Sequence, residues 1–181
     1  ADDGTLRIEP APELEMLRMN PRAHRDLRVG PDSDLAFDDV EGSCLELSVE
    51  VRPGDWQQFG VKVRSSPDGQ EETIVFMDVS AGTLTVDVTR SSLDKDIRFW
   101  PFRGDQPVER LPEEKQKRHA QEAPFELTPG ENLSLRIFVD RSVLEVFANG
   151  RQCLVQRMYP TRPDSVGVRL FCRGDVATVE S

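Results

Sequence analysis

Short runs in which apolar and polar residues alternate recur along the chain, and this two-residue period constrains the fold more than any other feature. Residues 45–51 show it best, because Leu45, Leu47, Val49 and Val51 fall on one face of an extended strand. Similar runs occupy residues 60–64, 73–79, 83–88, 143–148, 151–156, 166–172 and 176–179. Turn-forming Gly, Pro, Asp and Ser separate them. This spacing predicts an all-β fold, a two-sheet antiparallel β-sandwich of the lectin-like jelly-roll type.

The strongest local signal is a β-hairpin at Asn149-Gly150, between the runs at 143–148 and 151–156. Both residues tolerate positive φ, which the type I′ turn of a two-residue hairpin loop requires. A loop of that length pairs Val146 with Cys153 and Leu144 with Val155. We therefore expect these four side chains to face the core.

The opposite face of the expected hairpin is mixed. It carries Glu145, Phe147 and Leu154. Exposed apolar side chains next to a charge are typical of a partly covered outer surface. These three residues are candidates for a domain interface or a sugar-binding surface.

Length and charge narrow the possible partners. A chain of 181 residues suits one domain, and its 33 acidic and 23 basic side chains give a net charge of −10. Nucleic-acid binding relies on Lys and Arg neutralising phosphates, and anionic membranes repel an acidic chain. No apolar run approaches the ~20 residues that span a bilayer. We expect no nucleic-acid or membrane partner, while a sugar or another protein domain stays open.

The sequence offers no recognisable reaction centre. The two histidines, His24 and His119, lack neighbours at metal-ligand spacing, and no nucleophile-elbow, phosphate-loop or zinc-protease motif occurs. The abundant carboxylates are interpreted as a charged surface. The three cysteines fit free buried thiols, or a disulfide if the protein is exported. No catalytic residue, metal ligand or cofactor is therefore expected.

Two aromatic features are candidate contact sites. Trp56 follows a Pro-Gly-Asp turn, and Phe99, Trp100 and Phe102 form the densest aromatic cluster. Such rings can stack on sugars, complete a core or dock a second domain. The cluster belongs to residues 94–122, which we expect to be a long loop. A short helix is expected only at 11–18, because Pro21 limits it.

One long segment points to a family. Residues 133–150 read LSLRIFVDRSVLEVFANG, and residues 156–160 read QRMYP. These segments resemble the signature of the C-terminal module of glycoside hydrolase family 32, the family of levanases, invertases and β-fructofuranosidases. The resemblance implies two six-stranded sheets packed as a sandwich. In the family this module follows a five-bladed propeller, which carries the catalytic carboxylates in N-D-P-N-G, R-D-P and E-C motifs. This sequence contains none of the three.

The resemblance implies a non-catalytic domain of a fructan- or sucrose-hydrolysing glycosidase, a retaining β-fructosidase of levanase or β-fructofuranosidase type. The expected partner is the catalytic propeller of the same polypeptide, and the chain alone is expected to be inactive. Residues 1–20 would then be a linker from the propeller, and residues 21–181 the sandwich. A fructan-binding, lectin-like module or an oligomerisation domain is the alternative. For a polysaccharide-degrading parent, a secreted or periplasmic location is favoured.

Overall fold

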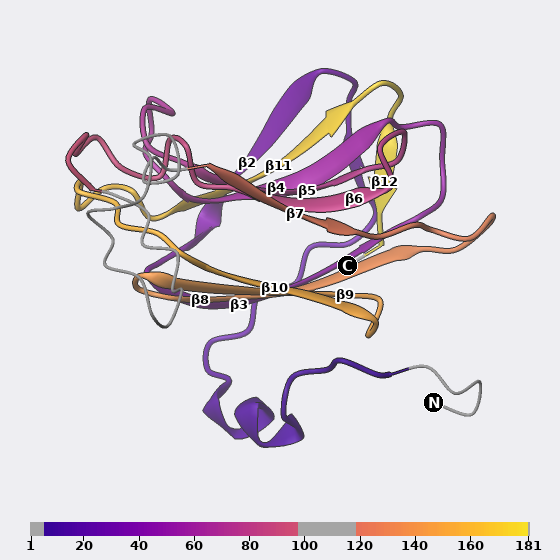
Figure 1. Ribbon diagram of the computed structural model, residues 1–181, viewed down its shortest axis with the longest axis horizontal. Coiled ribbons are helices and arrows are strands. Elements are labelled where there is room, and N and C mark those ends of the chain that lie inside the picture. The colour runs from indigo at the N-terminus through magenta and orange to yellow at the C-terminus, as the bar shows by residue number, and fades with distance from the viewer. Residues whose placement is uncertain (1–5, 98–118, 181) are drawn as a thin grey trace, which may run out of the picture.

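Two six-stranded antiparallel sheets face each other in the computed structural model, which describes residues 6–97 and 119–180 (Figure 1). Sheet A has the order β1-β12-β3-β8-β9-β10, and sheet B the order β2-β11-β4-β5-β6-β7. The strands of sheet A are β1 (Leu27–Val29), β3 (Cys44–Val51), β8 (Leu133–Asp140), β9 (Val143–Ala148), β10 (Gln152–Arg157) and β12 (Ala177–Val179). Those of sheet B are β2 (Ser33–Glu41), β4 (Gln58–Ser65), β5 (Thr73–Asp78), β6 (Thr83–Asp87), β7 (Ala120–Pro124) and β11 (Gly167–Arg173). The predicted β-sandwich is confirmed.

The core lies between the sheets and follows from the two-residue period. In β8 the side chains of Leu133, Leu135, Ile137 and Val139 are buried, while the residues between them are half-buried on the other face. The strands β5 and β9 alternate in the same way, and β3 does so in its second half, where Val49 and Val51 are buried. Each strand contributes one face to a shared apolar interior, which is why alternation alone predicted the fold class.

The sequence did not predict three of the strands, because apolar and polar residues alternate only weakly in them. The edge strand β2 is rich in Asp, and only Leu35, Phe37 and Val40 pack against the core from it. The edge strand β7 has the sequence AQEAP and begins within the stretch 94–122 that was expected to be a loop. The three-residue strand β1 gains its place by pairing with β12 at the far end of the chain. Pairing with a neighbour, rather than local preference, makes these segments strands.

The hairpin prediction was right about the position of its turn and wrong about the two-residue loop length and therefore about the register. Asn149 and Gly150 both have positive φ, 46° and 61°. The loop also includes Arg151, so Leu154 pairs with Val146 and Gln156 with Leu144. A shift of one residue turns every side chain of a strand to the opposite face. Leu154 is therefore in the core and not on the outer face, while Cys153 and Val155 point outward instead.

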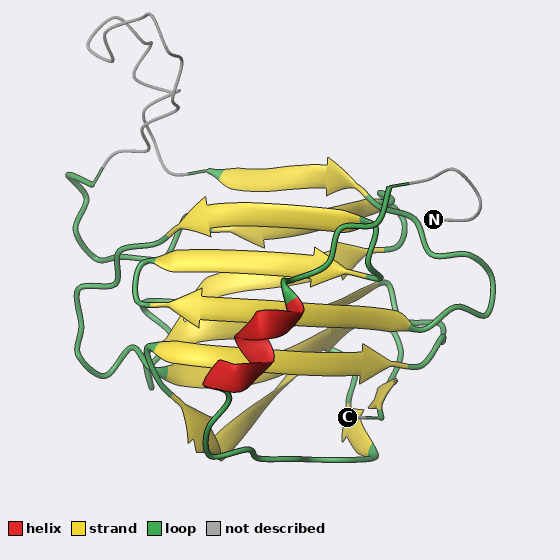
Figure 2. Ribbon diagram, turned by 90° about the horizontal axis from the view of Figure 1, so that it is seen from below, coloured by secondary structure: helices red, strands yellow, loops and turns green. Residues whose placement is uncertain are grey.

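The segment before β1 runs along the outer face of sheet A. It contains the 3-10 helix η1 (Pro12–Leu17), the short helix expected at residues 11–18. Figure 2 shows η1 lying across the strands of sheet A. No helix within the described ranges is long and apolar enough to cross a membrane.

Candidate functional site

The outer face of sheet A is built largely by residues 133–148. The strands β8 and β9 form a tight hairpin in which Asp140 pairs with Val143. Because alternate residues face the core, this hairpin presents Arg136, Phe138, Glu145 and Phe147 outward. The same segment that carries the sequence signature thus contributes seven buried residues to the core and, on its other face, side chains to this outer surface.

An aromatic pair occupies the middle of this surface. The rings of Phe138 and Phe147 meet edge to face, with centroids 6.0 Å apart. The guanidinium of Arg136 lies over Phe138, 5.4 Å from the ring centroid, and its Nη2 donates to Glu46 on β3. Glu46 thereby links the aromatic pair to the segment that precedes β1.

Residues 6–19, here called the N-terminal strap, are fastened to this surface by Glu46. Arg18 donates from Nε and Nη2 to the two carboxylate oxygens of Glu46, each over 2.8 Å. The hydrogen bonds from Arg18, together with those from Arg136, lower the pKa of Glu46 to about 2. At the other end of the strap, the Ile8 amide donates to the Gly150 carbonyl over 2.9 Å.

Asn149, the last polar residue of the signature, is occupied by structural hydrogen bonds. Its Oδ1 accepts from the Ser134 amide at 2.8 Å, and its Nδ2 donates to the Asn132 carbonyl and to Glu131. Arg151 adds a two-point contact to Glu131, whose pKa falls to about 2 chiefly through the hydrogen bonds from Arg151. The tip of the β9–β10 hairpin is thus tied to the start of β8.

Two of the residues expected from sequence as surface candidates lie inside the molecule. Trp56 is 3% exposed, belongs to the core and donates from its indole N–H to the Arg52 carbonyl over 3.1 Å. Leu154 is 5% exposed, for the register reason given above. The core packing covers the ring of Trp56 and the side chain of Leu154, so neither is accessible to a sugar.

The other expected candidates divide into two groups. Glu145 and Phe147 do lie on the outer face of sheet A, half-buried and on the same strand. Phe99, Trp100 and Phe102 lie outside the described residues, as does most of the stretch expected to be a loop. The structure therefore brings Glu145 and Phe147 together with Arg136 and Phe138, which sequence reasoning did not select.

Sequence reasoning also missed a buried carboxylate, Glu71, in the turn before β5. Its two oxygens accept hydrogen bonds from the Leu93 amide, the Thr161 amide and hydroxyl, the Arg162 amide and the Ser165 hydroxyl. Burial raises the pKa of Glu71, but these hydrogen bonds outweigh it and the pKa is lowered to about 2. The donors come from sequence positions 22 to 94 residues away, so no local pattern could reveal the contact.

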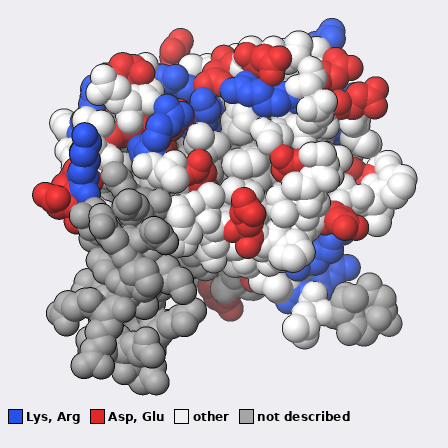
Figure 3. Space-filling view, turned by 45° about the horizontal axis from the view of Figure 1, so that its top comes forward, with Lys and Arg blue, Asp and Glu red and all other residues white. Residues whose placement is uncertain are grey.

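The outer face of sheet B is different in character. Lys and Arg side chains there are interspersed with Asp and Glu (Figure 3). Its central ring, Phe171, is only 4% exposed, because Lys62 and Arg173 lie over it. Lys62 also pairs with Asp34 at 2.6 Å. The charges neutralise one another and leave no broad basic surface on the face shown.

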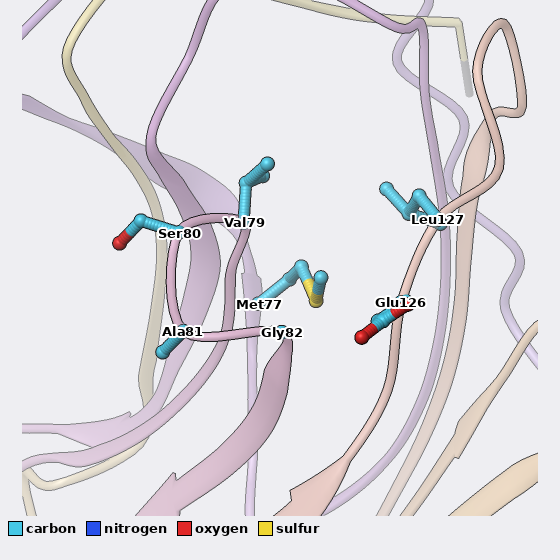
Figure 4. A pocket seen from close by; sticks show the side chains of 7 residues that line it. All are labelled: Met77, Val79, Ser80, Ala81, Gly82, Glu126 and Leu127. Carbon is cyan, nitrogen blue, oxygen red and sulfur yellow. The ribbon is translucent and has the colours of Figure 1, made fainter.

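A pocket of about 230 Å³ opens between the β5–β6 turn and the segment after β7 (Figure 4). Its lining residues are Met77, Val79, Ser80, Ala81, Gly82, Glu126 and Leu127. Glu126 is the only charged group in this lining. Over residues 6–97 and 119–180, no three His, Cys, Asp or Glu side chains are grouped to hold a metal ion. The pocket supplies no pair of groups for acid–base chemistry.

Comparison with known proteins decides the family. The model of the family described as "Glycosyl hydrolases family 32 C terminal" matches residues 13–181, nearly the whole chain. The chain belongs to the glycosyl hydrolase family 32 C-terminal family. A levanase from Bacillus subtilis (strain 168) is 30% identical over 95% of this chain, which corresponds to 23% of the levanase. An acid beta-fructofuranosidase from Vicia faba is 28% identical over 90% of this chain and 28% of its own length.

Solved structures show the same fold. Fructan 1-exohydrolase IIa from Cichorium intybus superposes with a TM-score of 0.69 at 18% identity, over 95% of this chain and 36% of that one. Exo-inulinase from Aspergillus awamori gives a TM-score of 0.61 at 22% identity, over 87% of this chain and 28% of that one. The chain spans about a quarter of the length of the curated relatives it matches, and in these family 32 proteins it corresponds to the C-terminal part.

Proposed function

We propose that this domain is the non-catalytic C-terminal sandwich of a fructan- or sucrose-hydrolysing glycosidase and that it supports the catalytic domain. The observation that carries the proposal is the extent of the family match. It covers almost all of this chain, yet only about a quarter of the levanase and the acid beta-fructofuranosidase. The hydrolytic activities in the names of those relatives belong to much longer proteins.

The carboxylates of the described residues support a structural role. Retaining glycoside hydrolysis uses two carboxyl groups about 5 Å apart, one of which is a general acid with a raised pKa. Six described carboxylates have clearly shifted pKa values, and all six shifts are downward. Each is held ionised by hydrogen bonds to neighbours within the domain. Such groups are poor proton donors near neutral pH.

Assays of the purified 181-residue chain with sucrose, inulin and levan test the first part of the proposal. We expect no release of fructose above the rate without protein. Turnover that disappears after a single carboxylate substitution in this chain would overturn the non-catalytic assignment. For the supporting role, the full-length natural polypeptide is compared with a version that lacks this domain. Removal is expected to speed thermal inactivation of the hydrolytic activity, and an unchanged half-life would argue against support.

Fructan binding by the sandwich itself is a second candidate, favoured only by the outward aromatic pair Phe138 and Phe147. The burial of Trp56 weakens it, because an indole ring in the core cannot stack on a sugar. Isothermal titration of the chain with inulin and levan oligosaccharides decides between the two roles. Heat of binding that disappears in Phe147→Ala would assign a sugar site, whereas no heat at millimolar sugar would exclude one.

A further inference from the structure

We propose that the N-terminal strap is a preformed docking element, held on sheet A by Glu46, that packs its exposed apolar side chains against the catalytic domain. The inference rests on the proposed function, because that function supplies the catalytic domain. It deepens the function by naming the surface that receives the partner. It also gives residues 6–19 a defined path, where the sequence suggested only a connecting linker.

The strap belongs to the sandwich. Arg18 and Arg136 approach the carboxylate of Glu46 from two sides, with Arg18 making a two-point contact. Such bidentate pairs fix geometry as well as distance. About ten residues earlier, the Ile8 amide is bonded to Gly150 at the tip of the β9–β10 hairpin. Two anchors at opposite ends set the path of the strap across the sheet (Figure 2).

The strap partly buries some of its side chains against the sandwich and exposes the others. Ile8, Pro10 and Leu14 are half-buried, whereas the other residues of the strap are exposed. Four large apolar side chains of the strap, here called the apolar row, are exposed: Leu6 at 84%, Met16 at 86%, Leu17 at 72% and Met19 at 82%. Single exposed apolar residues are ordinary, but four within fourteen positions mark an interaction surface.

The polypeptide that precedes this domain in its relatives is the partner that we infer covers the apolar row. In relatives that share this C-terminal domain, most of the polypeptide lies outside the matched part. That remainder joins the domain on its N-terminal side, where the strap lies. A domain attached next to the strap has a high effective concentration, so a small apolar contact suffices to hold it. The strap is therefore placed where a covalently linked catalytic domain meets the sandwich, and its apolar row fits the apolar part of a domain interface.

Hydrogen exchange on the 181-residue chain tests the anchoring without any partner. In the wild-type chain we expect the Ile8 amide to exchange slowly. Glu46→Gln removes the charge that holds Arg18 and is expected to speed this exchange about tenfold, since the strap then opens locally while the core strands stay closed. Glu50→Gln is the matched control, because Glu50 lies on the same strand and contacts Asn132 rather than the strap. Unprotected exchange of Ile8 in the wild type would overturn the anchored strap.

Calorimetry on the full-length natural polypeptide tests the docking. Coupled domains are expected to unfold in one transition, and Leu17→Glu is expected to split it into two by placing a charge in the apolar contact. Val79→Glu is the control, because Val79 is 47% exposed and lies in the β5–β6 turn of the other sheet. Unchanged unfolding in Leu17→Glu, with hydrolytic activity present, overturns the docking element and leaves the proposed function standing.

Two further outcomes separate the remaining alternatives. A full-length polypeptide that hydrolyses neither sucrose nor fructans counts against the proposed function itself, and the inference falls with it. Sedimentation of the 181-residue chain addresses a second copy as the occupant. A dimer that Leu17→Glu abolishes, together with unchanged full-length unfolding, would assign the apolar row to self-association and reject the catalytic domain. A monomer that is unaffected by Leu17→Glu agrees with the proposal.

Discussion

Glu46 and Glu71 are carboxylates with the same pKa of about 2 and with opposite surroundings. Glu46 lies on the outer face of sheet A between two guanidinium groups, one of them on the strap. Glu71 is fully buried and is held by neutral amide and hydroxyl donors from two separate segments, at Leu93 and at residues 161–165. A lowered pKa therefore has two meanings in this domain. Around Glu71 it reflects the stability of the fold, and around Glu46 the attachment of a peripheral segment.

The largest expected effect comes from Glu71→Gln. The side-chain NH2 group of glutamine is a donor and would replace one accepting carboxylate oxygen of Glu71. Buried N–H and O–H groups that now donate to that oxygen would then lose their acceptor. We expect a loss of about 3 kcal/mol in the free energy of unfolding, or roughly 10 °C in Tm. Urea denaturation measures it, with Glu122→Gln on the exposed part of β7 as the control. Equal effects of the two substitutions would mean that Glu71 does not hold the fold together.

Asn149→Ala is expected to cost about 2 kcal/mol, because it removes three side-chain hydrogen bonds and because alanine tolerates the positive φ of this position less well than asparagine does. Asn149→Gly separates the two causes, since glycine tolerates this φ but makes none of the hydrogen bonds. Chemical denaturation of both variants measures the difference. A fully stable Asn149→Gly would show that only the backbone conformation matters at this signature position.

The pH dependence separates the two carboxylates. A folded-state pKa below the ordinary 4.5 contributes stability that is present above about pH 4.5 and is lost as the pH falls toward 2. We expect acid to reduce the free energy of unfolding of the wild type in this window, and Glu71→Gln to flatten that slope. Glu46→Gln should flatten the slope less, because its partner Arg18 is about half exposed and solvent screens the pair. A flattening of the same size in both variants would remove the distinction between them.

The smallest expected effect is that of salt. Exposed ion pairs are weak and are screened at high ionic strength, whereas buried contacts are not. Raising NaCl to about 1 M should increase hydrogen exchange of the strap while Tm changes by no more than about 3 °C. Mass spectrometry of peptides from residues 6–19 and from β8 measures both regions in one experiment. Protection of the strap that does not depend on salt would mean that its apolar inner side holds it, and not Glu46.

Patterns within short segments predicted much of this molecule. Alternation placed β3, β5 and β9, because each strand buries one face of its own. The strands β1 and β7 carry little such signal and are strands only because β12 and β6 lie beside them. The hairpin turn was recognised from Asn149 and Gly150, but one additional loop residue, Arg151, moved Leu154 inward and Val155 outward.

Some features of the candidate site could likewise be predicted from the sequence, and others could not. The sequence predicted that Glu145 and Phe147 share an outward face, because residues two apart on a strand point in the same direction. It could not predict that Arg18 reaches Glu46, or that Thr161 and Ser165 close around Glu71. For Trp56 the sequence left open a sugar contact, a domain interface and a place in the core, and the packing between the sheets puts it in the core.

By itself, the sequence determined the sandwich class, most of its strands and the family, since those follow from a two-residue period and one long signature. Only the tertiary structure decided the register of the β9–β10 hairpin, the buried hydrogen bonds of Glu71 and the path of the strap over sheet A. The hydrogen bonds of Glu71 and the path of the strap depend on contacts between residues that are far apart in the chain, and the hairpin register depends on Arg151 being part of the loop. The free energy of such contacts is set by burial and by the geometry of the partners, which no local pattern encodes.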